Sequence, residues 1–170
     1  YWPNEERAED EKTLVSLIAK DRLISLLERM LSEMEFLSDG GIRALSKFHE
    51  TQPYKVTIDG TEYAIQYDPG DSTSDFFGGN SNWRGPVWMP INYLLIQSIK
   101  KFGEFYGDSL KMEYPKGSGV QMNLTDVSNE LIRRVVSLFE LDEVNNRKLH
   151  GDQNWFYQRP ENQHLVLFYE

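Results

Sequence analysis

Residues 78–96 read GGNSNWRGPVWMPINYLLI, and this stretch decides how the rest of the chain is interpreted. It opens with two glycines and the run Asn80-Ser81-Asn82, residue types that adopt backbone conformations bulkier side chains resist. Trp83, Arg84 and Trp88 follow within six positions, with a Gly-Pro bend between the two indoles. The stretch therefore predicts a rigid aromatic loop edged with polar side chains.

A helix is predicted to follow this loop. Pro90 stands where the first helical turn would begin, a position that proline tolerates because its missing N–H has no intrahelical partner there. Five of the six residues 91–96 are apolar, and Asn92 is the exception. A helix that is apolar on every side is typical of a fully buried one, and Gly107 is expected to end it. A rigid loop at the mouth of a buried helix predicts a pocket.

The composition of the chain excludes several classes of function. The 170 residues carry 18 Lys and Arg against 27 Asp and Glu, a net charge of −9, which argues against nucleic acid and anionic membranes. No apolar run approaches the ~20 residues that span a bilayer, and no signal-peptide pattern is present. The absence of cysteine excludes thiolate chemistry and favours a cytoplasmic setting. A surplus of aromatic residues on an acidic chain fits a neutral polar ligand such as a sugar better than a charged one.

Two further helices are predicted from apolar spacing. One has Leu23, Leu27 and Met34 on one face and is expected to stop at Asp39-Gly40-Gly41. A short helical turn around residues 14–18 is expected before it, after a loose lead-in over residues 1–12. The second runs from about residue 125 to 141, with Asn123 or Thr125 as its cap. The chain is therefore expected to be mainly α.

Residues 54–67, YKVTIDGTEYAIQY, carry the clearest local signal. Apolar and polar residues alternate on both sides of Asp59-Gly60, a dipeptide typical of a two-residue hairpin turn. This pattern predicts a small exposed β-hairpin inserted in a helical chain.

The two tryptophans of the central loop have two interpretations. They form a sugar platform if their faces stack on the apolar side of a pyranose while Arg84, Asn80 and Asn82 bind its hydroxyls. They belong to the core if Arg84 only bridges backbone carbonyls. The density of glycine and asparagine around Trp83 and Trp88 favours the sugar platform, because a core needs neither residue.

Other candidates are weaker. Asp68, Asp71 and Asp75 lack the spacing of a helix-loop-helix calcium site and read as a solvated turn. The three histidines share no metal-ligand spacing, so no metal or other cofactor is expected. Asn123-Leu124-Thr125 matches a glycosylation acceptor, but a helix cap is favoured. Glu170 follows an apolar run that would raise its pKa and make it an acid or base, unless it is simply exposed.

The central motif, with Pro90-Ile91-Asn92-Tyr93 after it, resembles the signature of glycoside hydrolase family 63. This family includes processing α-glucosidases and mannosylglycerate hydrolases. Three more segments resemble its microbial branch: residues 35–38 with 41–47, residues 67–71 and residues 167–170. The resemblance runs from about residue 20 to the end of the chain.

The resemblance implies an (α/α)6 barrel, of which residues 1–170 would be the C-terminal portion of a single catalytic domain, cut at both ends. It implies that the loop holds the sugar, which assigns substrate binding to Gly79, Asn80, Asn82, Trp83, Arg84 and Trp88. It makes Glu170 the general base. The family's general acid is an Asp that no residue of this chain matches. Since inverting glycosidases need both carboxyls, the chain alone is expected to be inactive.

The favoured hypothesis is a fragment of an inverting α-glycosidase that acts on an α-glucosidic or α-mannosidic bond of an oligosaccharide or glycoside. The alternative is a non-catalytic helical module that binds carbohydrate or a partner and retains the aromatic loop. A catalytic carboxylate pair distinguishes the two, because only an enzyme must keep it.

Overall fold

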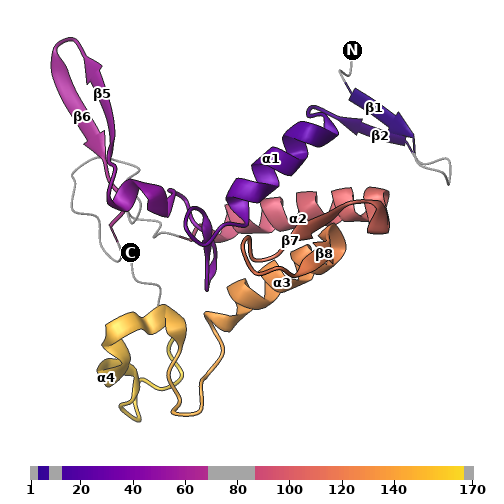
Figure 1. Cartoon of the computed structure of the whole chain (residues 1–170). Coiled ribbons are helices and arrows are strands. Elements are labelled where there is room, and N and C mark those ends of the chain that lie inside the picture. Colours follow the sequence, from indigo (N-terminus) through magenta and orange to yellow (C-terminus); the bar gives the residue numbers. More distant parts are fainter. Residues whose placement is uncertain (1–3, 8–12, 69–86, 167–170) are drawn as a thin grey trace.

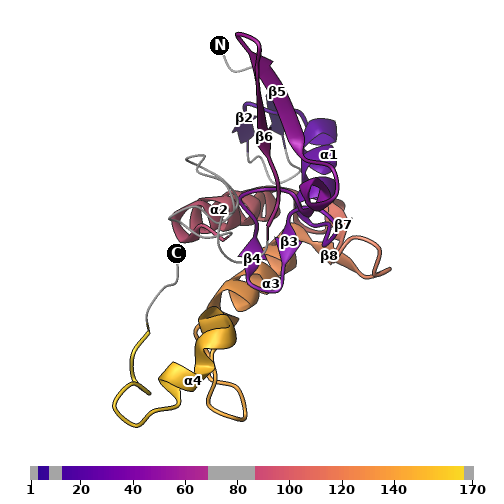
Figure 2. The same cartoon turned by 90° about the vertical axis from the view of Figure 1, so that its left-hand side faces the viewer.

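The computed structural model describes residues 4–7, 13–68 and 87–166. Three longer helices form its centre: α1 (Lys20–Met30), α2 (Met89–Tyr106) and α3 (Leu124–Ser137). Figure 1 shows α2 and α3 side by side with α1 across them, and Figure 2 shows the same group from a second direction. A fourth, four-residue helix, α4 (Asn154–Tyr157), belongs to the last described segment.

In the described residues, eight strands pair as four separate antiparallel hairpins. They are β1 (Asn4–Arg7) with β2 (Thr13–Ser16), β3 (Leu37–Ser38) with β4 (Gly41–Ile42), β5 (Tyr54–Ile58) with β6 (Thr61–Ile65), and β7 (Lys111–Glu113) with β8 (Gln121–Asn123). Short 3-10 turns cover Lys47–Glu50, Gly107–Ser109 and Lys148–Gln153. No helix within the described part of the chain is both long and apolar enough to cross a membrane.

The core lies between the three helices and the strands that join them. Its buried apolar residues are Leu23, Leu27 and Leu31 from α1 and its end, Ile96, Ile99 and Tyr106 from α2, Leu124, Val127 and Leu131 from α3, and Leu37, Ile42, Leu110, Met112 and Tyr114 from the strands and turns. Close approach of α2 to α3 depends on Gly103, since a Cβ there would lie 2.6 Å from the backbone nitrogen of Thr125. The β3–β4 and β7–β8 hairpins therefore contribute side chains to the core.

The expected fold class is wrong. The chain was predicted to be mainly α and to form part of an (α/α)6 barrel. The described residues instead form a mixed α/β structure with four helices and four small sheets. The stretch 14–18 shows why: a helical turn was expected there, but residues 13–16 form β2 and pair with β1. The branched side chains of Thr13 and Val15 suit a strand. The helix expected to continue to Asp39 ends at Met30, and Asp39-Gly40 instead forms the turn between β3 and β4.

Other local predictions are confirmed. The β5–β6 hairpin is present, with Asp59 at φ 50° and Gly60 at φ 80°, the positive values that its two-residue turn requires. It projects from the body of the molecule in both views (Figures 1 and 2) and its strands are exposed. Pro90 lies in the first turn of α2, and Gly107 ends that helix.

The predicted burial of α2 on every side is wrong. Ile91, Tyr93 and Leu94 are 46%, 63% and 59% exposed, whereas Asn92, the polar exception, is 2% exposed. Tertiary contacts with β4 and α3 determine which face of this helix is covered, and the apolar run itself does not reveal it.

Candidate functional site

Most of the predicted site lies outside the described residues. Gly79, Asn80, Asn82, Trp83, Arg84 and Glu170 all fall there. Trp88 alone among the predicted site residues is placed, so the assembly of the loop with Glu170 stays a prediction.

Trp88 is the residue from which α2 begins. Its backbone is extended, at φ −84° and ψ 110°, and its carbonyl accepts the first helical hydrogen bond, from the Asn92 N–H at 2.9 Å. The side chain is half-buried. Pro90 stabilises this boundary, because its fixed φ suits the first turn of a helix.

The side-chain amide of Asn92 connects the start of α2 to the β3–β4 hairpin. Its Oδ1 accepts a hydrogen bond from the Ile42 N–H at 2.7 Å, and its Nδ2 donates to the Ile42 carbonyl at 2.9 Å. Nδ2 also donates to the Trp88 carbonyl at 3.0 Å. Asn92 thus pairs with one residue of β4 much as a neighbouring strand would, and it binds Trp88 with the same group.

The β3–β4 hairpin is shaped to receive this amide. Gly41 has φ +126°, and a Cβ there would lie 2.8 Å from Asn92 Oδ1 and 3.0 Å from Val135. The Ser38 hydroxyl donates to the Gly41 carbonyl at 2.8 Å. From α3, Arg134 Nη1 donates to the Ser38 carbonyl at 2.9 Å. Side chains of both α2 and α3 therefore hydrogen-bond to the backbone of the β3–β4 hairpin.

Arg43 follows the hairpin in one of the segments that resembles the family. Its Nη1 donates to the backbone carbonyls of Glu33 and Glu35, each at 3.1 Å, and to that of Leu37. Its guanidinium also lies 5.7 Å from the centroid of the Tyr67 ring. These contacts give Arg43 a structural role, because a guanidinium that saturates several carbonyls stabilises the loop between α1 and β3.

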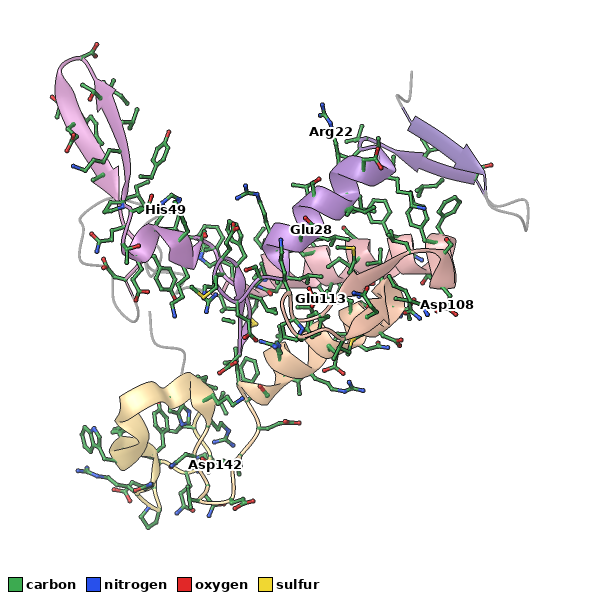
Figure 3. The ribbon with its side chains drawn as sticks, viewed as in Figure 1. Arg22, Glu28, His49, Asp108, Glu113 and Asp142 are labelled. Atoms are coloured by element: carbon green, nitrogen blue, oxygen red, sulfur yellow. The ribbon has the colours of Figure 1, made fainter. Side chains whose placement is uncertain are left out.

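Two carboxylates beside the β7–β8 hairpin have lowered pKa values. Backbone N–H groups of Gly117 and Gly119 lower the pKa of Glu113. A hydrogen bond from Asn123 and the charge of Lys111 lower the pKa of Asp108. Figure 3 shows these carboxylates at opposite ends of the β7–β8 hairpin, where they stabilise turns.

Predictions about other polar residues have mixed outcomes. Asn123 is the N-cap of α3, and its Oδ1 accepts from the Asp126 N–H at 2.9 Å, which confirms the cap. His49 lies at the base of the β5–β6 hairpin (Figure 3), 2.8 Å through Nδ1 from the Gln52 carbonyl. Asp68 is half-buried, while Asp71 and Asp75 lie outside the described residues. Across residues 4–7, 13–68 and 87–166, no group of three or more His, Asp or Glu side chains could hold a metal ion.

Asn92 was missed as a site residue by reasoning from the sequence. Its signals were that one amide interrupted an apolar run and that it stands in the segment 90–93 that resembles the family signature. Its partner, Ile42, lies 50 positions away, so no local pattern could have identified the bridge.

Comparison with known proteins identifies the family of this chain. Residues 13–142 match the family model described as the glycosyl hydrolase family 63 C-terminal domain. The chain is 45% identical over 162 residues to YMR196W, an uncharacterized protein of Saccharomyces cerevisiae. The aligned region covers 94% of this chain and 15% of the yeast protein. The chain thus spans about 15% of the length of the curated relative it matches. No solved structure matches it significantly. The match over residues 13–142 includes α1, α2, α3 and the Trp88–Asn92 bridge, and the chain therefore belongs to glycosyl hydrolase family 63.

Proposed function

We propose that this chain supplies the sugar-binding loop and the general base of an inverting α-glycosidase. The enzyme would hydrolyse an α-glucosidic or α-mannosidic bond in an oligosaccharide or glycoside. Membership of glycosyl hydrolase family 63 is the observation that carries this proposal. Substrate binding is assigned to Trp83, Arg84 and Trp88, with Gly79, Asn80 and Asn82 beside them, and the base is Glu170.

The position of Trp88 supports the binding part of the proposal. A half-buried indole at the first turn of a helix presents a flat apolar face without a flexible stem. The Asn92 amide bonds the Trp88 carbonyl, so the backbone that carries this indole is restrained. Stacking on a sugar ring benefits from such restraint, because less entropy is lost on binding.

The chemistry requires two carboxyl groups. In an inverting glycosidase they lie ~6.5–9.5 Å apart, so that a water molecule fits between the base and the anomeric carbon. Glu170 would accept a proton from that water, while an Asp elsewhere in a longer polypeptide would protonate the leaving oxygen. The yeast relative has ample length for such a residue, since the matched region is 15% of it.

The binding half is tested with the chain itself. We would titrate the ¹⁵N-labelled protein with maltotriose and, separately, with methyl α-mannoside, and follow the indole N–H signals. Saturable binding that Trp88→Ala weakens at least about tenfold supports the proposal. Trp155→Ala is the matched control, because Trp155 lies in α4, outside the core, and is 57% exposed. A chain that binds neither sugar, or that binds equally after Trp88→Ala, contradicts the assignment.

The catalytic half separates the enzyme from the alternative, a non-catalytic carbohydrate- or partner-binding module. The enzyme and a carbohydrate-binding module would both bind sugar through the loop, but only the enzyme needs Glu170 for turnover. Substitution of that residue in the longer polypeptide therefore decides between them.

A further inference from the structure

The buried amide of Asn92 makes three hydrogen bonds in the described core. It is 2% exposed, and both of its donor hydrogens and its acceptor oxygen have partners. Two of the three bonds go to Ile42 in β4 and the third goes to Trp88. An isolated buried amide would be costly, so these bonds explain why a polar residue is stable in this position.

The geometry requires an asparagine. Aspartate could still accept from the Ile42 N–H, but its carboxylate would face the carbonyls of Ile42 and Trp88 with no hydrogen to donate. Leucine has the same branched shape but is larger, and it would leave the N–H and carbonyl of Ile42 buried without these bonds. The space is also restricted, because Gly41 approaches so closely that a Cβ would lie 2.8 Å from Asn92 Oδ1.

The bond to the Trp88 carbonyl connects this amide to a residue of the proposed sugar-binding loop. The Trp88 carbonyl receives two hydrogen bonds from Asn92, one from the backbone N–H at 2.9 Å and one from Nδ2 at 3.0 Å. The backbone bond alone is an ordinary helical bond at a helix end, where fraying is common. The side-chain bond ties the same carbonyl to the β3–β4 hairpin.

We propose that Asn92 is a positioning residue, which holds Trp88 in a constant orientation relative to the β3–β4 hairpin so that its indole is preorganised to stack on sugar. This inference rests on the proposed function for its link to sugar binding. Asn92 itself does not touch the substrate. It acts through Trp88, because restraint of the first turn of α2 restrains the backbone that carries the indole.

A purely structural role for Asn92 makes a different prediction, and Arg134 offers the matched comparison. Arg134 anchors the same hairpin from α3 through a 2.9 Å bond to the Ser38 carbonyl, and it also bonds Glu33 in the preceding loop at 2.9 Å. Loss of this anchor destabilises the hairpin without removing any contact of Trp88 with Asn92. If Asn92 only stabilises the fold, Arg134→Met and Asn92 variants of equal stability should affect Trp88 equally.

The experiment compares Asn92→Leu, Asn92→Asp, Arg134→Met and Ser98→Ala in the full 170-residue chain. Asn92→Asp preserves size and one hydrogen bond, so it is the variant to use if Asn92→Leu does not fold. Ser98→Ala is the control on the same helix, since the Ser98 hydroxyl is exposed and bonds only the Leu94 carbonyl among the contacts described. Urea unfolding gives the stability of each variant, ¹⁵N relaxation gives the order parameter of the Trp88 indole N–H, and titration with maltotriose gives the affinity.

We expect the order parameter to fall from about 0.85 toward 0.6 in the Asn92 variants and to stay high in the two controls. Maltotriose affinity should fall about tenfold or more in the Asn92 variants and less than about twofold in Arg134→Met at matched stability. An unchanged order parameter in a folded Asn92 variant overturns the proposal, as does an equal fall in Arg134→Met. If the wild-type chain binds no sugar, the proposed function fails, whereas the order parameter still decides whether Asn92 positions Trp88.

Discussion

The imidazole of His150 lies face to face with the ring of Tyr157, with centroids 3.4 Å apart and planes inclined by 8°. His150 is 1% exposed, and neither of its ring nitrogens has a hydrogen-bond partner in the described part of the chain. Burial lowers the pKa of His150 below its ordinary value, and the charge of Arg147 adds to this effect. The folded chain therefore holds a neutral imidazole in the stack.

Acidification should destabilise the segment that contains this stack. The unfolded chain binds a proton at His150 more readily than the folded chain, so the free energy of unfolding falls as pH drops through the ordinary value of 6.5 and stops falling below the lowered folded pKa. Urea unfolding between about pH 7.5 and 5.5 should show this loss in the wild type. His150→Phe, which can still stack on Tyr157 but cannot titrate, should lose less stability over the same range. Equal losses in the two proteins would assign the effect to other groups.

Gly103→Ala should destabilise the α2–α3 contact. A Cβ there would lie 2.6 Å from both the backbone nitrogen and Oγ1 of Thr125, so the helices must separate. Overpacking of this kind costs about 1–3 kcal/mol, which exceeds the gain of up to about 1 kcal/mol from replacing a helical glycine. Urea unfolding measures the difference, with Ser98→Ala on the exposed side of α2 as control. A stabilised Gly103→Ala variant would mean that the two helices can move apart at no cost.

Asn123→Ala should weaken α3 at its first turn. Loss of the bond from the Asp126 N–H to Asn123 Oδ1 costs about 1 kcal/mol for a typical cap. The same change should raise the pKa of Asp108, because the amide of Asn123 donates to Asp108 Oδ1 at 3.1 Å and is the largest cause of its lowered pKa.

Asn123→Asp separates these two effects. It keeps the cap oxygen but removes the donor to Asp108, so stability should be largely retained while the pKa of Asp108 rises. Carbon-detected NMR titration of the Asp108 carboxyl and urea unfolding measure the two quantities. If the pKa of Asp108 is unchanged in both variants, the hydrogen bond from Asn123 is not the cause of the lowered pKa.

Glu170→Gln in the longer polypeptide should reduce kcat by orders of magnitude while substrate binding is largely retained. Glutamine has nearly the same shape, but it cannot accept a proton from the attacking water. Steady-state kinetics with an α-glucoside and an α-mannoside give kcat and KM separately. Unchanged turnover would remove Glu170 from the mechanism and favour the non-catalytic alternative for this chain.

The 170-residue chain by itself should hydrolyse no α-glucoside or α-mannoside. The proposed inverting reaction needs two carboxyls, and the proposal assigns only one of them, Glu170, to this chain. Prolonged incubation with an aryl α-glucoside, with release of the phenol as readout, tests this. Hydrolysis that is lost in Glu170→Gln would show that the second carboxyl is present in the chain after all.

Predictions succeeded where a few neighbouring residues determine the structure. Asp59-Gly60 between two alternating runs gave the β5–β6 hairpin, because only certain residues accept two positive φ values in succession. The side chain of Asn123 caps α3 through a residue three positions away. Pro90 marked the start of α2 for an equally local reason.

Predictions failed where the partner was distant in the sequence. The strand at residues 13–16 exists because it pairs with β1, whereas the spacing of Leu14, Leu17 and Ile18 alone predicted a helical turn. Family membership followed from the motif, but the barrel that the resemblance implied was wrong for the described residues. A motif identifies relatives without determining how much of their architecture a short chain forms.

The sequence by itself determined the β5–β6 turn, the Asn123 cap, the two ends of α2 and the family. Only the tertiary structure decided which face of α2 is buried, why Gly103 and Gly41 must be small, and what the amide of Asn92 binds. The physical reason is that a turn or cap is stabilised within a few residues, whereas burial and a buried amide pair depend on groups such as Ile42 that the folded chain brings from 50 positions away.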